Sequence, residues 1–358
     1  MRTPLTLVVA PAGTGKTSLL SGWAAESTIG TAWLSLDETD GDAARFWSGV
    51  IAAVETVVPG CGERALAPLR RAAPVEAVDQ LLEDLEASAG SPTILVVDDL
   101  HHAVDDDVVA ASLALFLEHL PAWLHVVLVS RRVPRLSLAR LRARGRLAEV
   151  RFAELRFSPF EARELLSRLD PSLAGERVDA AVREADGWAA ALQMAALTAR
   201  SARAQEDDEA PGSSDLMVHD YVVREVLASE GQDLIDALSD VAIVRRVNAS
   251  LARALTGRDD AADLLRRAET RGLFVTRLDP QGWYEVHSPI RAALVAELSN
   301  LRRSVWSNST SVPRGGSRTK GSFPLPSSTG CSPADPEKRS ASSRPRARSC
   351  TTAVRRRS

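Results

Sequence analysis

The chain has 358 residues, of which 45% are hydrophobic and 25% are charged, a composition that is ordinary for a soluble globular protein and leaves room for two or three domains. Its three cysteines, Cys61, Cys331 and Cys350, lack the spacing of metal ligands, so the sequence indicates neither a disulfide framework nor a zinc site. We find no signal peptide and no apolar run long enough to span a membrane, and we therefore expect a cytoplasmic location without a membrane partner.

The net charge of −3 conceals two parts of opposite sign. Residues 301–358 hold 13 Arg and Lys against 2 Asp and Glu, whereas the first 300 residues hold 31 basic and 45 acidic side chains. The last part is also rich in Ser and Pro and has too few apolar residues to bury a core. We therefore predict a folded acidic body followed by a disordered basic tail, 301–358.

The first element is a short apolar strand, Leu5 to Val9, which runs into a glycine-containing loop and then a helix with an apolar face. This order is typical of a phosphate-binding loop, in which backbone N–H groups and a helix N-terminus face a polyphosphate. Ala10 replaces the first glycine of the motif, a mild change because the cradle begins at Gly13. We predict that a nucleotide contacts Pro11, Ala12, Gly13, Thr14, Gly15, Lys16, Thr17 and Ser18.

Strand and helix patterns alternate from this loop to about residue 155. The further predicted strands are 32–36, 93–97, 125–130 and 148–152, and the predicted helices are 41–58, 75–88, 108–120 and 136–144. The continuous apolar run at 93–97 is typical of a strand buried on both faces. The alternation predicts an α/β fold of the P-loop NTPase type, with a parallel sheet wrapped by helices.

Helical patterns alone follow from Ser158. The segment Ser158-Pro159-Phe160-Glu161 is a capping box with proline at the first helical position, and it predicts a helix start. Further helices are predicted at 175–185, 188–202, 216–229, 231–240, 250–256 and 260–271. A β-hairpin around Asp279-Pro280-Gln281-Gly282 then suggests a winged-helix-like module. The predicted division is an ATPase domain at 1–155, an all-helical domain at 156–205, a winged-helix-like domain at 206–300 and the tail.

Two carboxylates end the apolar strand ILVVDD and supply the second half of a nucleotide site. We expect Lys16 to reach the β- and γ-phosphates, while Thr17 and Asp98 hold Mg²⁺, Asp98 usually through water. Asp99 is then placed to orient or deprotonate an attacking water. An apolar strand that simply ends in two aspartates is the alternative.

Arg131 directly follows the next predicted strand. Because the carboxyl ends of parallel strands share one edge, Arg131 is a candidate sensor of the γ-phosphate charge, with a solvated basic turn as the alternative. The pair His101 and His102 is more typical of a surface or supporting role than of a metal site. His287, at the end of the hairpin, taken by itself suggests a half-buried histidine.

These residues and motifs resemble the ATPase module of the MalT/LuxR-type large transcriptional regulators, within the STAND class of signal-transduction ATPases. The resemblance covers roughly residues 3–297 and rests on LTLVVAPAGTGKTSLLSGWA, TAWLSLDETDGDAARFW, ILVVDDLHH, LPAWLHVVLVSRRVPRLSLARLRARGRLAEV, LRFSPFEARELL, ADGWAAALQMAAL and GLFVTRLDPQGWYEVH. It implies an ATPase domain, a helical lid at 156–205 and a winged helix that closes over the nucleotide.

The resemblance also implies roles for single residues. The phosphate-binding loop of the family falls on Gly13, Gly15, Lys16 and Thr17, the acids beside Mg²⁺ fall on Asp98 and Asp99, and the sensor arginine falls on Arg131. The histidine that contacts the phosphates of ADP in related proteins falls on His287. Gly187-Trp188 matches a lid turn near the adenine, with a packing role for the tryptophan as the alternative.

Three departures from the family pattern concern what surrounds this module. Only a few residues precede the P-loop strand, where relatives carry a segment that helps to hold the adenine. The sequence does not contain the effector-sensing repeats or the DNA-binding helix-turn-helix. In their place stands the basic tail, which we interpret as the product of a shifted reading frame or a truncation.

We therefore expect a switch that binds ATP or ADP with Mg²⁺, is closed with ADP and open for self-association with ATP, and hydrolyses ATP slowly. One alternative is a P-loop enzyme or motor ATPase that acts on a substrate. Another is an inert remnant whose basic tail adheres weakly to nucleic acid.

Overall fold

The computed structural model describes residues 3–88, 90–204, 213–228 and 230–296. The chain divides into two compact units, Met1–Thr310 and Ser311–Ser358, and every described residue belongs to the first. The predicted tail, 301–358, lies outside the described residues. Among the described helices, none combines the length and the apolar character needed to cross a membrane.

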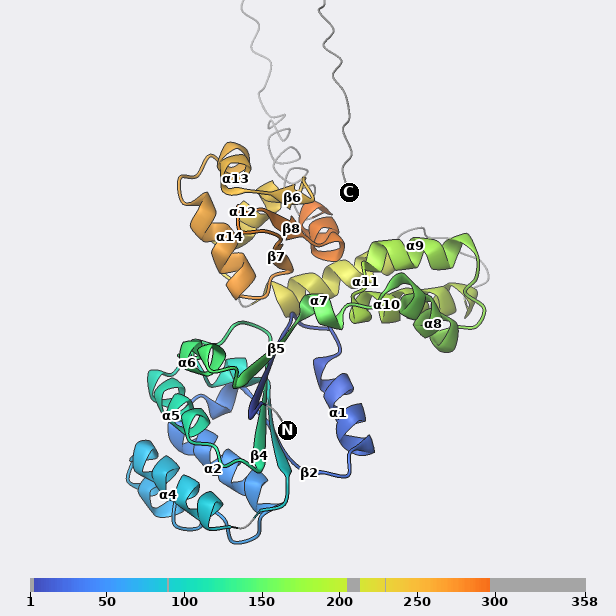
Figure 1. The fold of residues 1–358 in the computed structure, drawn as a ribbon. Helices are drawn as coiled ribbons and strands as arrows, with labels where there is room; N and C mark the ends of the chain where they lie inside the picture. Colours follow the sequence, from blue (N-terminus) through green and yellow to red (C-terminus); the bar gives the residue numbers. More distant parts are fainter. Residues whose placement is uncertain (1–2, 89, 205–212, 229, 297–358) are drawn as a thin grey trace, which may run out of the picture. The chain divides into compact units, whose positions relative to one another are not determined.

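A five-stranded sheet with strand order β2-β3-β4-β1-β5 organises the N-terminal part (Figure 1). The strands are β1 Leu5–Val9, β2 Gly30–Ser35, β3 Thr93–Asp98, β4 Leu124–Ser130 and β5 Leu147–Arg151. All four pairings are parallel, so the predicted P-loop-type α/β fold is confirmed. Val9 pairs with Ser130 and Val97 pairs with Leu128, which places the carboxyl ends of β1, β3 and β4 along one edge.

Alternating strand residues separate two cores on the two faces of this sheet. Leu5 and Leu7 of β1 join the core beneath α2, α4 and α5, whereas Val8 joins a smaller core to which Leu20 of α1 adds. Figure 1 shows α1 on the face opposite to these three helices. The helices of this part are α1 Lys16–Glu26, α2 Ala43–Glu55, α3 Leu66–Arg70, α4 Pro74–Ala87, α5 Asp107–Glu118, α6 Ala139–Ala143 and α7 Phe152–Leu155.

A group of helices follows the sheet. Its members are α8 Pro159–Leu169, α9 Glu176–Ala185, α10 Ala189–Ala204 and α11 Ser213–Tyr221, the last continuing into a π-turn at Val222–Val226. The predicted capping box begins α8: the Ser158 side chain accepts a hydrogen bond from the Glu161 N–H at 3.3 Å, and the Glu161 carboxylate accepts one from the Ser158 N–H at 2.8 Å. The sequence could predict this helix start because both residues of the capping box lie within one helical turn.

A winged-helix arrangement closes the described part. Its elements are α12 Gln232–Val241, β6 Arg246–Val247, α13 Ala249–Thr256, α14 Ala261–Thr270, β7 Val275–Arg277, β8 Tyr284–Val286 and a helix at 288–296. The predicted hairpin is β7 and β8, and β6 adds a third antiparallel strand on the other edge of β8. Sequence reasoning missed β6 because a strand of two residues carries no alternation.

Candidate nucleotide-binding site

The loop between β1 and α1 has the geometry of a phosphate cradle. Gly13 and Gly15 have φ angles of 69° and 82°, in the left-handed region that favours glycine, and Gly15 caps α1. The first N–H groups of α1 lack partners within the helix, as at any helix start, and the helix dipole is positive there. The Lys16 ammonium group donates to the backbone oxygens of Ala10 and Pro11 at 2.8 and 2.9 Å, which keeps it beside the loop.

The end of β3 contributes Asp98 to the site, where it contacts Thr17 of α1. The Thr17 hydroxyl donates a hydrogen bond of 2.8 Å to Oδ2 of Asp98, although 81 positions separate the two residues. The other carboxylate oxygen of Asp98 accepts the Asp99 N–H at 2.9 Å. Asp98 is 2% exposed, so both hydrogen bonds hold its carboxylate in one orientation. A hydroxyl and a carboxylate are oxygen groups of the kind that P-loop proteins use to bind Mg²⁺ beside a nucleotide.

Asp99 lies at the cavity side of the same strand end. Its φ angle of 54° is in the left-handed region, which aspartate tolerates better than most residues. Its carboxylate lies 3.8 Å from Nε of Arg131 and 3.7 Å from Nδ1 of His101. Burial, aided by the positive charges of His102 and Arg131, lowers the pKa of His101 to about 3, so this imidazole is neutral near pH 7. Arg131 therefore supplies the cationic neighbour of Asp99.

A cavity of about 990 Å³ opens beside these residues. Seven residues of the loop and α1 start line it together with Asp99 and Arg131: Ala12, Gly13, Thr14, Gly15, Lys16, Thr17 and Ser18. Pro11 and Asp98 contact Lys16 and Thr17 without lining the cavity. The structure thus brings the predicted site residues of the ATPase domain together.

The opposite wall of the cavity comes from α7, α8, α10, α11 and the segment between α7 and α8, and is largely apolar apart from Glu154, Arg156 and Glu161. It includes Leu155, Phe157, Leu165, Leu169, Ala189, Ala190, Gln193, Met194, Leu197, Met217 and Tyr221. Phe157 lies between α7 and α8, and the other ten lie on helices. Sequence reasoning missed them because their apolar patterns indicate only packing, and the tertiary fold alone places them opposite the loop.

Trp188 and the start of α10 bind the glycine-containing loop after β1 at two of its carbonyl groups. The Trp188 indole N–H donates to the Ala12 carbonyl at 3.0 Å, and the Ala190 N–H donates to the Gly13 carbonyl at 2.9 Å. Trp188 is 1% exposed and packs edge-on against Phe274, so it has the packing role that was one of the two expectations. A Cβ atom on Gly13 would approach Cβ of Ala190 to 2.6 Å, so the contact depends on a glycine.

His287 does not line the cavity. It is 4% exposed, its ring packs edge-on against Phe152 at 5.0 Å, and its Nε2 lies 3.1 Å from the Thr276 hydroxyl. Its Nδ1 lies 3.5 Å from the carboxylate of Asp186, at the end of α9. Burial alone would raise the pKa of Asp186, but the hydrogen bond with His287 and the charge of Arg156 outweigh it and lower the pKa. Contact between His287 and phosphates stays a prediction.

We expect nucleotide affinity to depend on pH through the charge state of Lys16. Burial, with a smaller effect of the Arg131 charge, lowers the pKa of Lys16 to about 8, against the opposing effects of Asp99 and Asp98. A bound polyphosphate favours the charged ammonium, so above pH 8 binding must first return a proton to Lys16. We expect the association constant for ADP to fall by up to about tenfold per pH unit above pH 8 and to be flat just below it.

Titrations between about pH 7 and about pH 9.5 measure this effect, and calorimetry in buffers of different ionisation enthalpy measures the proton uptake. A constant affinity across this range, without proton uptake, would contradict the assignment of Lys16 as the phosphate ligand.

Comparison with known proteins agrees with this arrangement. Residues 223–306 match the family described as the MalT winged helix domain. The HTH-type transcriptional regulator MalT of Cronobacter sakazakii is 34% identical over 317 residues, 86% of this chain, and that of Serratia proteamaculans is 35% identical over 292 residues, 79% of this chain. This chain contains a MalT-like ATPase region followed by a MalT winged-helix domain. The predicted resemblance is confirmed.

The MalT-like chain spans about one third of the length of these relatives, 34% and 32% respectively. Among solved structures, a Walker-type ATPase of Pyrococcus abyssi matches with a TM-score of 0.60 and 17% identity, over 82% of this chain and 91% of that one. At this identity the likeness concerns the fold, which is that of a P-loop ATPase.

Proposed function

We propose that this chain is the nucleotide-binding switch of a MalT-like transcriptional regulator, which binds ATP or ADP and hydrolyses ATP slowly. The observation that carries the proposal is the 2.8 Å hydrogen bond between the Thr17 hydroxyl and the buried Asp98 carboxylate, whose charge acts on the neighbouring buried Lys16. These three groups offer one cation for phosphate and two oxygen ligands for Mg²⁺. The similarity to regulators named HTH-type supports the assignment to transcription.

The residues fit Mg²⁺ that arrives with the nucleotide. Thr17 and Asp98 supply two ligand positions, and phosphate oxygens and water are the usual remaining ones. Bound Mg²⁺ would neutralise phosphate charge. Lys16 holds the β- and γ-phosphates, and Asp99, one residue after the Mg²⁺-side acid, orients the water that attacks the γ-phosphate.

The apolar wall of the cavity supports placement of the adenine there. Phe157, Leu165, Met194 and Leu197 offer a surface against which a planar base packs, and Gln193 offers an amide for its polar edge. The phosphates then lie over the loop and the base lies against the lid. A bound nucleotide thereby connects the ATPase domain to α10.

The segment that follows β4 connects the nucleotide site to the winged helix, so the bound nucleotide affects the winged helix through it. Arg131 lines the cavity, and two residues later the Val133 N–H donates to the Thr270 carbonyl of α14 at 3.0 Å. A change of charge at the γ-phosphate would move Arg131 and alter this contact. ADP would favour the closed arrangement, whereas ATP would favour an open form able to self-associate, provided that the two nucleotides bind these forms with different affinity. His287 would report closure between lid and winged helix.

The substitution Asp98→Asn tests the proposal. It keeps the size of the side chain and one acceptor but removes the charge, so we expect the Mg²⁺-dependent gain in ATP affinity to fall by about tenfold or more and hydrolysis to be lost. The measurement is a titration of a fluorescent ATP with and without Mg²⁺.

Asp79→Asn, which alters an exposed carboxylate of α4, is the matched control. Unchanged Mg²⁺ dependence in Asp98→Asn would refute the site. A turnover raised strongly by some added substrate would instead favour the alternative of a substrate-directed P-loop enzyme.

A further inference from the structure

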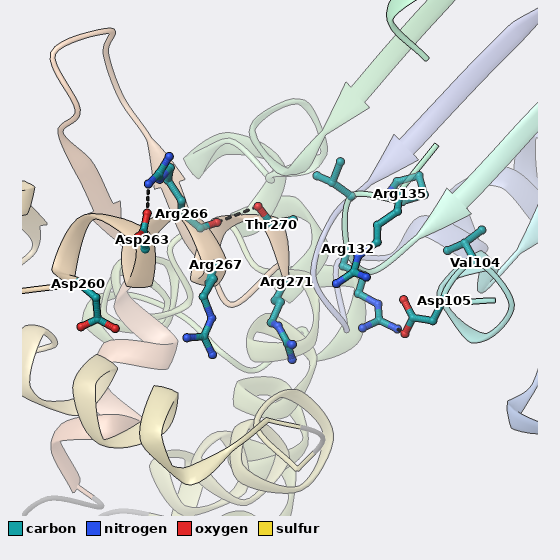
Figure 2. A pocket seen from close by; sticks show the side chains of 12 residues that line it. Val104, Asp105, Arg132, Arg135, Asp260, Asp263, Arg266, Arg267, Thr270 and Arg271 are labelled. Carbon is teal, nitrogen blue, oxygen red and sulfur yellow. Dashed lines mark hydrogen bonds and ion pairs between the residues drawn. The ribbon is translucent and has the colours of Figure 1, made fainter. Parts of the chain in front are cut away.

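A second cavity, of about 950 Å³, lies between the segment after β4 and helix α14 (Figure 2). It is separate from the nucleotide cavity and shares no lining residue with it. Its walls carry five arginines and three aspartates: Arg132, Arg135, Arg266, Arg267, Arg271, Asp105, Asp260 and Asp263. The volume is that of a small-molecule site.

Each aspartate of this cleft already has an arginine partner. Arg132 pairs with Asp105 at 2.5 Å, Arg266 pairs with Asp263, and Asp260 is bound at 2.8 Å by Arg258, which does not line the cleft. Arg271 is bound at 2.7 Å by Glu230, also outside the cleft lining. Figure 2 shows Arg132 reaching towards Asp105 and Arg266 turned towards Asp263.

Two arginines of the cleft remain, Arg135 and Arg267. Within the described residues, neither side chain makes a hydrogen bond or an ion pair, and both are exposed. They come from opposite walls, one from the segment after β4 and one from α14. In Figure 2, Arg267 and Arg271 leave α14 on the same side, while Arg266 points the other way. The cleft therefore holds two guanidinium groups that no carboxylate among the described residues binds directly. The hydrogen bond and charge of Arg258 are the main causes of the lowered pKa of Asp260, and the charge of Arg267 adds only a minor effect.

We propose that this cleft binds a small phosphate-bearing anion between Arg135 and Arg267. A phosphate monoester carries nearly two negative charges at pH 7, which matches the two arginines without a direct carboxylate partner among the described residues, and guanidinium groups bind phosphate in bidentate geometry. A single carboxylate would neutralise only one of them. A long polyanion such as DNA is disfavoured by the aspartates around the cleft. It is also disfavoured by the net negative charge of residues 1–300, which hold 45 acidic and 31 basic side chains.

Binding here acts on the nucleotide site through the backbone. The anion ties the two walls of the cleft together, and the same walls meet at the bond between the Val133 N–H and the Thr270 carbonyl. Arg132 lines the cleft, while its neighbour Arg131 lines the nucleotide cavity. A phosphate-bearing ligand therefore stabilises the closed form and slows the release of ADP. The anion site itself does not depend on the proposed switch, but this coupling does.

Pyrophosphate is the probe, measured by calorimetry on the full chain. Pyrophosphate cannot bind at the P-loop in the Lys16→Ala variant or in wild-type protein saturated with ADP. Any pyrophosphate that these two samples still bind is therefore bound at the cleft. We expect one pyrophosphate per chain in each, weakened about tenfold by Arg135→Ala and by Arg267→Ala, because each variant removes one charge-assisted contact. Arg70→Ala, at an exposed arginine of α3 outside the cleft, should leave it unchanged.

Release of a fluorescent ADP should slow severalfold when pyrophosphate is present, and not in the double variant of Arg135 and Arg267. Absence of pyrophosphate binding, or binding that neither arginine variant weakens, would overturn the anion site. An unchanged rate of ADP release would overturn the coupling. Pyrophosphate binding to the Lys16→Ala variant is measured without any nucleotide. Failure of the anion site is therefore distinguishable from failure of the proposed switch.

Discussion

Lys16→Ala should lose ADP and ATP almost completely, with affinity lower by at least about a hundredfold. The ammonium group lies beside the phosphate-binding loop, bound to the Ala10 and Pro11 carbonyls, and it is only 7% exposed. Charge-assisted bonds to two phosphates are lost with it, and Lys16 is the only lysine among the described residues. The measurement is the nucleotide released from purified protein by acid, together with a titration of fluorescent ADP.

Lys16→Met serves as the partner variant because it keeps the length of the side chain and removes only its charge. Equal loss in both variants, with the nucleotide-free melting temperature preserved, assigns the effect to phosphate binding. Nucleotide content that is the same in Lys16→Ala as in the parent chain would refute the site.

Gly272→Ala should separate the winged helix from the ATPase domain. Gly272 has a φ angle of 70°, and a Cβ atom there would lie 2.1 Å from the carbonyl oxygen of Arg131. No rotamer change relieves a clash between Cβ and backbone, so the residues after β4 or the start of β7 must move. We expect rapid proteolysis between the two domains and ADP release faster by about tenfold or more, since Arg131 lines the nucleotide cavity.

Gly282→Ala provides the control for backbone strain alone. Gly282 also has a positive φ angle, 88°, but nothing lies within 4 Å of the place that a Cβ atom would take. Alanine there should lower the free energy of unfolding by roughly 1–2 kcal/mol, the cost of a left-handed conformation, and leave ADP release unchanged. Equal behaviour of the two variants would show that the contact between Gly272 and Arg131 does not hold the domains together.

Features encoded locally were predictable from the sequence. The P-loop strand, its glycines and Lys16 lie within a dozen residues, and the capping box at Ser158 lies within one turn, so spacing alone indicated them. Placing Asp98 near the P-loop also required the rule that the carboxyl ends of parallel strands lie at a common edge. In the structure the Asp98 carboxylate accepts a hydrogen bond from the Thr17 hydroxyl.

Features that depend on the meeting of distant segments were not predictable in this way. Tyr221 and Met194 line the cavity beside the loop after β1, but they come from helices whose patterns indicate only packing. Gly272 looks like an ordinary turn glycine until the fold places Arg131 against it. The cleft with Arg135 and Arg267 is likewise invisible in a sequence with many arginines, because what distinguishes these two is that no carboxylate among the described residues binds them.

Amide hydrogen exchange at Val133 and Ala190 tests the switch most directly. The Val133 N–H is bound to Thr270 of the winged helix and the Ala190 N–H to Gly13 of the phosphate-binding loop, so both report closure. With ADP both amides should be protected, and with Mg²⁺ and a non-hydrolysable ATP analogue both should exchange at least about tenfold faster, while β3 amides stay protected. Equal exchange at Val133 and Ala190 with the two nucleotides would contradict a nucleotide-dependent switch.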